Sequence, residues 1–373
     1  MVDRVYPKIY LPDQLCVKGA VDDVYFVGAD NRKYLDLLSG GGAFFLWRYG
    51  DKSVKRILSS HFISTSNFLQ HKSKGLLASE LSQLTGFPLV YFLCSGSEAI
   101  DAAIKMAYKY HGGKRKKVGK VRGSYHGRTG LSVRCGPEGY SSYLPDGKDF
   151  ITIESASILG GDFAAVIIEG CCPQEILKAY DDEALRWIVV KCIEHDIVLI
   201  ADEVRSGLGR TGYILSSETW SNGLDFSQKK PDIVVIGKSL CAGFPLSAVL
   251  MREKFYDCID KDWHSSTAGG HPMLCELSRY LLSSLGGECL TEIAGKSWRM
   301  GKELDTVFPD IEYTQFGLWW NLFVDDAFDV SKKLRIEGVL VYCTSDDSIT
   351  LFPSMHFTMT HWTEFLAALN EAI

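Results

Sequence analysis

Four short apolar runs mark the middle of the chain, and stretches with helical periodicity separate them. The runs are residues 89–93, 164–168, 197–200 and 233–236. Each is apolar at successive positions rather than at alternate ones, which is typical of strands buried on both faces of a parallel sheet. Between the runs, residues such as Ala99, Ala103 and Ala107 recur at helical spacing. The alternation predicts a doubly wound α/β domain with a mostly parallel sheet.

The two ends of the chain have a different pattern. Residues 24–27 and 34–37 flank a turn-like segment, which predicts a hairpin, and the glycine-rich residues 39–42 after it are interpreted as flexible. Beyond about residue 276 the strand candidates and the last helix are residues 318–324, 339–342, 349–352 and 361–372. We therefore expect an N-terminal hairpin segment (1–45) that contributes to a small domain, a large domain (46–275) and a small C-terminal α+β domain (276–373).

The composition suits a large folded core. Of the 373 residues, 46% are hydrophobic and 23% are charged, which excludes general disorder and collagen-like repeats. The 40 Lys and Arg against 46 Asp and Glu give a net charge of −6, so no global positive field attracts a phosphate backbone and no nucleic-acid partner is expected. The chain lacks both a secretory apolar segment and a run of about 18 uncharged apolar residues, so we expect neither export nor a membrane span.

The cysteines indicate a reducing compartment. There are 11 of them, without a CxxC pair and mostly within apolar stretches, which is typical of reduced core thiols in the cytoplasm. The adjacent pair Cys171-Cys172 suggests a metal or redox site, but no His or further Cys accompanies it, and packing is the better interpretation. We therefore assign no metal.

Ligands of an open parallel sheet bind where the strands end, so the residues after each apolar run are the ones to inspect. The first run ends in Ser95-Gly96-Ser97-Glu98 and leads into a helix. Ser97 is predicted to cap this helix, and free backbone N–H groups then face outward at the positive end of the helix dipole. The sequence predicts an anion site here.

Two opposite charges follow two further runs. Asp202 ends the run at 197–200 with Glu203 and Val204 behind it, and Lys238 follows the run at 233–236. A buried Asp–Lys salt bridge is one interpretation, because buried charges usually pair. The segment Arg122-Gly123-Ser124-Tyr125-His126-Gly127-Arg128-Thr129 adds an aromatic ring beside flexible glycines. An anion site, a carboxylate, an amine and a flat ring are together what pyridoxal phosphate requires.

With these motifs in this order, the chain resembles the class III aminotransferases, a branch of the pyridoxal-phosphate enzymes of fold type I. The resemblance runs from about residue 20 to the C-terminus. Its motifs are Ser95-Gly96-Ser97-Glu98-Ala99, Ser124-Tyr125-His126-Gly127-Arg128-Thr129, Asp202-Glu203-Val204, Gly209-Arg210-Thr211-Gly212, Pro231-Asp232-Ile233, Gly237-Lys238 and His264-Ser265-Ser266-Thr267. It implies a large domain with a mostly parallel, seven-stranded type of sheet and a smaller α+β domain.

The resemblance also implies roles for individual residues. Lys238 is the implied Schiff-base lysine and proton carrier, and Asp202 is the implied partner of the pyridine nitrogen. The other implied cofactor residues are Gly96 and Ser97 at the phosphate, Tyr125 and Val204 on the two faces of the ring, and His126. Thr267 resembles the residue that such enzymes extend to the phosphate of the partner subunit, which implies a homodimer.

The activity implied is transamination from an amine or (ω-)amino acid donor to a keto acid or aldehyde acceptor. One amino group leaves the donor and is held by the cofactor until the acceptor takes it in the same pocket. Aminomutases, epimerases and decarboxylases of the same family share these core motifs, so they remain alternatives. An epimerase, unlike a transaminase, needs no acceptor.

Three departures from the family pattern concern the substrate. Arg205 stands where many members have Gln near the cofactor's phenolic oxygen, and it can alter the ring electrostatics, bind a substrate anion or form a surface ion pair. After Glu169 the chain reads Gly170-Cys171-Cys172-Pro173-Gln174, without the glutamate that gates a carboxylate-binding arginine in ornithine-type members. The segment that supplies that arginine reads Thr314-Gln315-Phe316-Gly317-Leu318.

Without that glutamate and arginine, we expect a pocket that lacks the usual α-carboxylate clamp and takes an amine or ω-amino substrate. Removing both avoids one unpaired buried charge. Glu169 and Arg205 are candidate substrate residues, and the segments with Trp47, Arg48, Trp319 and Trp320 are candidates to line the pocket. For each tryptophan a core or dimer contact is the better interpretation.

Overall fold

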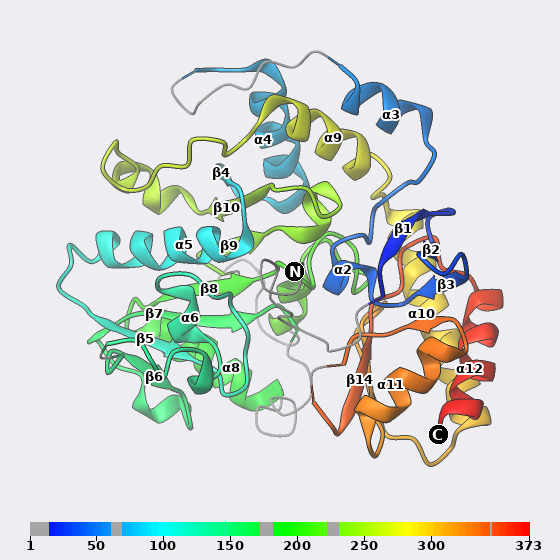
Figure 1. Cartoon of the computed structure of the whole chain (residues 1–373). Helices are drawn as coiled ribbons and strands as arrows, with labels where there is room; N and C mark the ends of the chain where they lie inside the picture. Colours follow the sequence, from blue (N-terminus) through cyan, green and yellow to red (C-terminus); the bar gives the residue numbers. More distant parts are fainter. Residues whose placement is uncertain (1–14, 61–68, 146, 172–181, 222–230, 344) are drawn as a thin grey trace.

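The computed structural model describes residues 15–60, 69–145, 147–171, 182–221, 231–343 and 345–373. In Figure 1 a large sheet with its helices lies on one side of the molecule, and a smaller group of helices and strands that includes the C-terminus lies on the other. Within the described part of the chain, no helix is long and apolar enough to cross a membrane.

The large sheet has seven strands in the order β4-β10-β9-β8-β7-β5-β6. Their bounds, in that order, are Leu89–Leu93, Ser247–Met251, Ile233–Ile236, Val198–Asp202, Phe163–Glu169, Lys117–Lys120 and Phe150–Thr152. β10 runs antiparallel to both of its neighbours, and the pairs from β9 to β6 are parallel. The mostly parallel sheet predicted from the sequence is confirmed, with β10 as its reversed strand.

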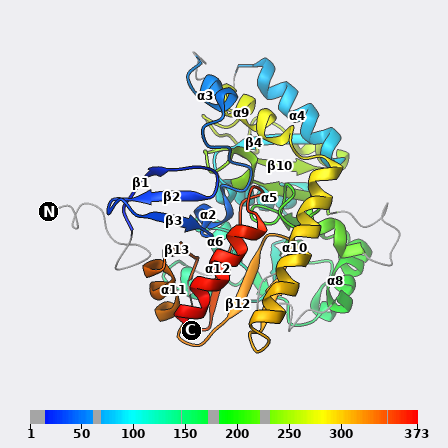
Figure 2. The same ribbon diagram turned by 90° about the vertical axis from the view of Figure 1, so that its right-hand side faces the viewer.

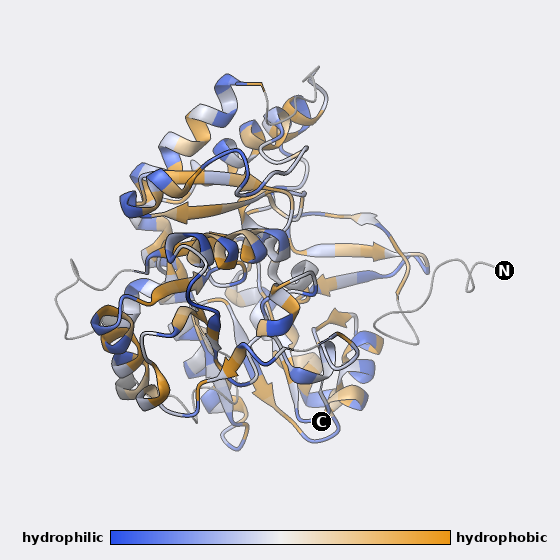
Figure 3. Cartoon of the chain, turned by 90° about the vertical axis from the view of Figure 1, so that its left-hand side faces the viewer, coloured by the Kyte–Doolittle hydropathy of each residue, from blue (hydrophilic) through white to orange (hydrophobic). Residues whose placement is uncertain are grey.

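Both faces of this sheet are covered by apolar side chains. Along β7, Ala165 and Ile167 belong to one buried cluster, while Val166 and Ile168 belong to another. The first cluster contains the buried face of α5 (Gly96–Tyr110), and the second contains that of α8 (Asp182–Glu194). This is why successive positions of the strands are apolar, and Figure 3 shows central strands coloured as hydrophobic while outer helices alternate.

Around the large sheet lie α3 (Lys52–Leu58), α4 (Lys72–Thr85), α6 (Ser132–Cys135) and α9 (Pro272–Leu282). α9 packs against α4 and against the short helix η5 (Lys238–Cys241). The expected domain boundary at residue 275 falls inside α9. We propose that the small domain begins after this helix.

The small part joins the two ends of the chain. The N-terminal strands β1 (Val17–Ala20), β2 (Tyr25–Gly28) and β3 (Lys33–Asp36) form the predicted hairpin and one further strand, and β3 pairs in parallel with β13 (Val339–Leu340). A second sheet has the order β11-β12-β14. Its strands are Tyr313–Gln315, Trp320–Phe323 and Ser348–Leu351.

Three helices complete this part of the molecule. They are α10 (Gly287–Val307), α11 (Ala327–Ile336) and α12 (Met359–Ala372). In Figure 2, α10 and α12 lie side by side in front of β12, and they pack together through buried residues such as Trp362 and Met300. The strands and the last helix predicted beyond residue 276 are present, with bounds that differ by a few residues.

The glycine-rich residues after the hairpin are not the flexible stretch that the sequence suggested. They form a tight turn, α2 (Ser39–Gly42), in which all four residues have positive φ, from 47° at Ser39 to 87° at Gly42. Glycine takes this left-handed conformation without a steric penalty, so the sequence allows a turn that a chain with side chains resists. Asp36 stabilises it by accepting hydrogen bonds from the backbone N–H groups of Leu38 and Ser39.

Candidate active site

Asp202 ends β8 at the carboxyl edge of the sheet and is almost completely buried. Its Oδ2 atom lies 2.8 Å from Nδ1 of His126, and its Oδ1 atom accepts a hydrogen bond of 3.0 Å from the backbone N–H of Val204. Asp202 and Lys238, both described, form no ion pair with each other. The salt bridge considered from the sequence is therefore wrong, and the carboxylate is held by a histidine instead.

Lys238 follows β9 with a φ of 40°, a value uncommon for a residue with a side chain. Its Nζ donates a hydrogen bond to the carbonyl of Gly41 in the α2 turn. Burial holds the pKa of Lys238 well below its usual range, and the positive charges of Arg205 and Arg210 lower it further, against the attraction of Asp202 and Glu169. At a given pH this amine is uncharged, and so nucleophilic, more often than an ordinary lysine.

The N-terminus of α5 points its free donors toward the same edge of the sheet. The cap is Ser95 and not Ser97 as expected from the sequence, since the Oγ of Ser95 accepts a 3.2 Å hydrogen bond from the N–H of Glu98 and Ser97 lies inside the first turn. In the described part of the chain, the N–H groups of Gly96 and Ser97 have no acceptor. A 15-residue helix adds its dipole to these donors, which suits a phosphate group.

Glycines allow three segments to meet at this helix end. A Cβ atom on Gly96 would lie 2.9 Å from Cγ1 of Val204, and one on Gly127 would lie 2.2 Å from Oγ of Ser97. Gly127 also has a φ of +117°, which side chains rarely allow. Ser97, in turn, accepts a hydrogen bond of 3.4 Å from the N–H of Arg128. The structure thus brings Gly96, Ser97 and Val204 together.

Tyr125 and Glu169 lie next to Asp202. The backbone N–H of Tyr125 donates a 2.8 Å hydrogen bond to Oε1 of Glu169, and Glu169 pairs in register with Asp202 across β7 and β8. Burial raises the pKa of Glu169, with Arg205 opposing the shift. The predicted residues at the ends of these two strands are therefore one cluster.

Arg205 faces aromatic rings rather than a surface carboxylate. Its guanidinium carbon lies 5.0 Å from the ring centroid of Tyr125 and 5.9 Å from that of Trp319. Among the described residues it forms no ion pair, so the surface pair considered from the sequence is absent. Trp319 is 1% exposed and also packs against Phe352.

The remaining candidates lie apart from this cluster. Trp320 is a core residue, stacked on Tyr313 with ring centroids 5.3 Å apart, and Trp47 packs on Phe244 at 5.9 Å. Arg48 acts electrostatically on Asp51 and His356, and no contact among the described residues joins it to Lys238.

Thr267 is exposed in the isolated chain, on the loop before α9. Its neighbour Ser266 places Oγ 3.5 Å from Sγ of Cys94, one residue before the cap of α5. The loop therefore reaches the anion-binding end of that helix. Cys171 is buried beside Trp319, while Cys172, Pro173 and Gln174 lie outside the described residues. The described residues contain no cluster suited to a metal ion.

Arg210 is a residue of the site's framework to which the sequence reasoning assigned no role. Fully buried, it donates hydrogen bonds to the carbonyls of Leu318 (2.9 Å) and Gly42 (2.8 Å), and burial lowers its pKa to about 9. Gly42 follows Gly41, whose carbonyl accepts the hydrogen bond from Lys238. Arg210 therefore fixes the α2 turn beside the amine. In the sequence, the motif Gly209-Arg210-Thr211-Gly212 was the signal from which a role of Arg210 could have been inferred.

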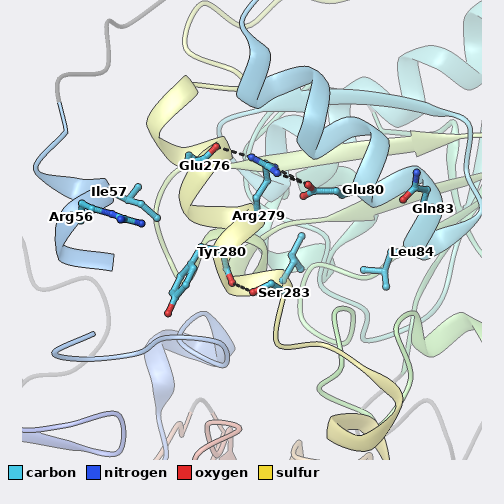
Figure 4. A pocket seen from close by; sticks show the side chains of 10 residues that line it. Arg56, Ile57, Glu80, Gln83, Leu84, Glu276, Arg279, Tyr280 and Ser283 are labelled. Atoms are coloured by element: carbon cyan, nitrogen blue, oxygen red, sulfur yellow. Dashed lines mark hydrogen bonds and ion pairs between the residues drawn. The ribbon is translucent and has the colours of Figure 1, made fainter. Parts of the chain in front are cut away.

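A separate cavity of about 600 Å³ lies between α3, α4 and α9. Figure 4 shows Arg279 between Glu80 and Glu276, at N···O distances of 2.7 and 2.9 Å. Because both carboxylates already pair with Arg279 and none of the predicted site residues lines the cavity, it is not the catalytic centre.

The cluster at the sheet edge fits a flat cofactor that carries a phosphate and a ring nitrogen. The unpaired N–H groups at α5 suit the phosphate, and the buried Nε2 of His126 has no hydrogen-bond partner within the described residues. Asp202 and Lys238 are electrostatically coupled yet unpaired, as expected for two groups that act on opposite parts of one ligand.

Known proteins agree with this chemistry. The family model of class-III aminotransferases matches residues 11–146 and 144–373. The acetylornithine aminotransferase of Haemophilus ducreyi is 29% identical over 344 residues, which cover 87% of this chain and 86% of that protein. The one from Methanocaldococcus jannaschii is 28% identical over 381 residues, covering 95% and 92%.

Solved structures share the fold. Adenosylmethionine-8-amino-7-oxononanoate aminotransferase from Methanocaldococcus jannaschii has a TM-score of 0.86 at 22% identity, covering 99% of this chain and 98% of that one. Ornithine aminotransferase from Toxoplasma gondii has a TM-score of 0.85 at 22% identity, covering 100% and 92%. With the family model matched over nearly the whole chain, the protein belongs to the class III aminotransferases, transaminases of fold type I that use pyridoxal phosphate.

Proposed function

We propose that this site moves an amino group from an amine or ω-amino acid to a keto acid or aldehyde, with Lys238 and Asp202 as its catalytic residues. The observation that carries the proposal is the pair itself. A lysine of lowered pKa and a buried carboxylate held by His126 share the carboxyl edge of the sheet without neutralising each other. A structural salt bridge would have joined them.

Pyridoxal phosphate, when bound, supplies an aldehyde carbon for the amino group and a pyridine ring that accepts electrons from the substrate carbon. Asp202 would keep a proton on the ring nitrogen, since its Oδ2 is oriented by His126 and its Oδ1 by the N–H of Val204. Gly96 and Ser97 would bind the phosphate, and Tyr125 and Val204 would enclose the ring.

Lys238 would perform two tasks in turn. Its uncharged amine would hold the cofactor in the resting enzyme. When free of the cofactor, the same amine would take the proton from the substrate carbon and pass it on, a role that suits a base of lowered pKa. The carbonyl of Gly41 orients Nζ, and the α2 turn is itself fixed by Arg210.

The class of donor is supported by two observations. The curated relatives are named for acetylornithine, an amino acid derivative that carries a carboxylate besides its free amine. In this chain the arginine-bearing segment of the family reads Thr314-Gln315-Phe316-Gly317-Leu318, so a carboxylate would have to be bound by another group.

We also propose a homodimer in the cytoplasm. Thr267 is exposed in the isolated chain, on a loop that reaches the helix end where the phosphate would bind, and there it can serve the site of a second copy. The described cysteines other than Cys171 are free thiols, which suits a reducing compartment. Sedimentation of the holoenzyme would measure the oligomeric state, and a monomer that is fully active would contradict the dimer.

A panel of amino donors tests the function. Holoenzyme is mixed with each donor in the absence of an acceptor, and absorption is followed for the change from the aldehyde to the amine form of the cofactor. We expect amines or ω-amino acids to produce the change and a keto acid or aldehyde to reverse it. The Lys238→Ala variant is the negative control. Holoenzyme that responds to none of the donors would contradict the proposal.

A further inference from the structure

The guanidinium of Arg205 lies close to the catalytic amine and lacks an acceptor. In the described part of the chain it forms neither a hydrogen bond nor an ion pair, and its contacts are the rings of Tyr125 and Trp319, 5.0 and 5.9 Å from its guanidinium carbon. Such stacking fixes the planar group but uses none of its N–H donors. The donors therefore remain available to a ligand.

A second donor belongs to one of the two rings that Arg205 contacts. Nε1 of Trp319 is buried without a hydrogen-bond partner among the described residues, although the residue is only 1% exposed. Buried N–H groups are rarely left unpaired, because a buried donor has lost its hydrogen bonds to water and gains none in return. Two neighbouring donors without acceptors indicate a missing group that is rich in acceptors.

The electrostatic effects of Arg205 indicate that its guanidinium lies near Lys238 and Glu169. Arg205 is the strongest charged influence that lowers the pKa of Lys238, and also the strongest that lowers the pKa of Glu169. Glu169 has its own partner in the N–H of Tyr125, and no ion pair within 4.0 Å joins it to Arg205. A carboxylate bound to Arg205 would thus lie near the lysine amine.

Two other buried or half-buried arginines make the contrast clear. Arg210 donates to the carbonyls of Gly42, Leu318 and Pro353, and Arg279 pairs with carboxylates. These two guanidinium groups are structural, since the protein itself supplies their acceptors. Arg205 differs from both.

We propose that Arg205, assisted by Nε1 of Trp319, binds a carboxylate of the substrate, and that this selects ω-amino acids over simple amines. A guanidinium binds a carboxylate through two parallel N–H···O bonds, which fixes the direction of the substrate chain as well as its charge. The amino group at the other end then reaches the Lys238 side of the pocket. This inference rests on the proposed transamination and specifies its substrate.

Two donors that differ only in the carboxylate test the proposal, namely 5-aminopentanoate and pentylamine. The kcat/KM of wild-type holoenzyme and Arg205→Gln is measured with each. Because Arg205 also lowers the pKa of Lys238, the two proteins are compared on the high-pH plateau, where this amine is uncharged in both. There we expect the substitution to lower kcat/KM for 5-aminopentanoate by about ten- to a hundred-fold, mainly through KM, and to leave that for pentylamine within about two-fold. Arg205→Lys should restore only part of the loss, because a lysine lacks the planar fork.

The carboxylate can also belong to the acceptor. The second measurement therefore compares kcat/KM for a keto acid with kcat/KM for an aldehyde, in wild type and Arg205→Gln. The matched control is Arg122→Gln, which removes the same charge from an exposed arginine paired with Glu154. Arg122→Gln should leave kcat/KM unchanged for both donors and both acceptors. An equal loss for both donors in Arg205→Gln would mean that Arg205 serves the cofactor, and would overturn the inference.

Binding without turnover supplies an independent measurement. Glutarate, which has carboxylates but no amine, is titrated into holoenzyme by calorimetry. We expect binding to the wild type and to Arg122→Gln, and a loss of at least about ten-fold in Arg205→Gln. No measurable glutarate binding to the wild type would overturn the inference. If neither donor reacts with wild-type holoenzyme, the proposed function fails, and the glutarate titration still decides the role of Arg205.

Discussion

The cofactor side and the substrate side of the site differ in how their polar groups are paired. On the cofactor side, Asp202 is held by His126 and Lys238 by the carbonyl of Gly41. On the substrate side, Arg205 and Nε1 of Trp319 have no acceptor within the described residues. The protein therefore orients one half of its site by its own hydrogen bonds and leaves the other half to be completed by a ligand.

This difference has a physical reason. A cofactor that stays bound through many reactions needs catalytic groups in fixed positions, which internal hydrogen bonds provide. A substrate that must leave after each reaction is better bound by donors that gain their partner only on binding. The following variants test the two halves of the site separately.

Lys238→Ala should have the largest effect. Removing the amine removes both the covalent attachment and the proton carrier, so turnover should fall by at least about a thousand-fold, as measured by steady-state kinetics. Lys120→Ala is the matched control, because Lys120 is also buried, has a lowered pKa and donates to a carbonyl, that of Gly136. If both variants lose activity alike, burial rather than position at the site explains the loss.

Asp202→Asn should lower kcat by roughly a hundred- to a thousand-fold while the cofactor remains bound. The amide keeps the size of the side chain but cannot hold a proton on the ring nitrogen as a carboxylate does. Rapid-mixing spectra of the donor half-reaction would measure the rate. Asp232→Asn is the control. Asp232 lies just before the first residue of β9, at the end of the strand away from Lys238, and pairs with Lys254. An Asp202→Asn enzyme with normal kcat would contradict the role of the carboxylate.

Gly127→Ala should weaken cofactor binding without removing any catalytic group. Its Cβ would lie 2.2 Å from Oγ of Ser97 at a φ of +117°, so the segment must move away from α5. We expect a loss of stability of about 1–3 kcal/mol and a cofactor dissociation constant raised about ten-fold. Gly139→Ala, where nothing lies within 4 Å, is the control in thermal melts and cofactor titrations.

Arg205→Gln should shift the pH dependence of Lys238. Because the charge of Arg205 lowers the pKa of this amine, its removal should raise that pKa. The uncharged amine reacts, so the rate at which the apoenzyme takes up pyridoxal phosphate, followed against pH, should have its midpoint at a higher pH in the variant. A midpoint that moves to lower pH, or that moves equally in Arg122→Gln, would argue against the placement of Arg205 beside the amine.

Asp36→Asn should have the smallest effect on activity and a measurable one on stability. Burial raises the pKa of Asp36 from 3.8 to about 6, so the folded protein holds this proton more tightly than the unfolded chain. The free energy of unfolding should then decrease as pH rises from about 4 to about 6, by at most about 3 kcal/mol. Denaturant titrations at several pH values should show that Asp36→Asn lacks this decrease. An unchanged slope would contradict the raised pKa.

Much of the cofactor side was predictable from the sequence, because it depends on residues that directly follow buried strands. The apolar runs placed Asp202 and Lys238 at strand ends, and parallel strands bring such ends together. β10 was not among the predicted runs, and its reversed direction could not be predicted in this way either, since a buried antiparallel strand has the same apolar pattern as a parallel one. β5 was missed because Lys117 and Lys120 interrupt its pattern.

The contacts around the α2 turn and Arg205 were less predictable, because they join distant parts of the chain. The α2 turn was interpreted as flexible, and only the folded structure brings Gly41 to Lys238 and Gly42 to Arg210. Trp319 and Trp320 are adjacent, yet Trp319 packs by Arg205 and Trp320 packs in the core of the small part. Which of two neighbours faces a site depends on the exact position of β12, and a pattern of residues does not fix that position.

We propose above all that the amine of Lys238 carries the cofactor. To test this, holoenzyme is reduced with borohydride, digested and analysed by peptide mass spectrometry. We expect the phosphopyridoxyl group on the peptide with Lys238, and not on that with Lys120. A label on another lysine, or holoenzyme whose cofactor is released unreduced after denaturation, would contradict it.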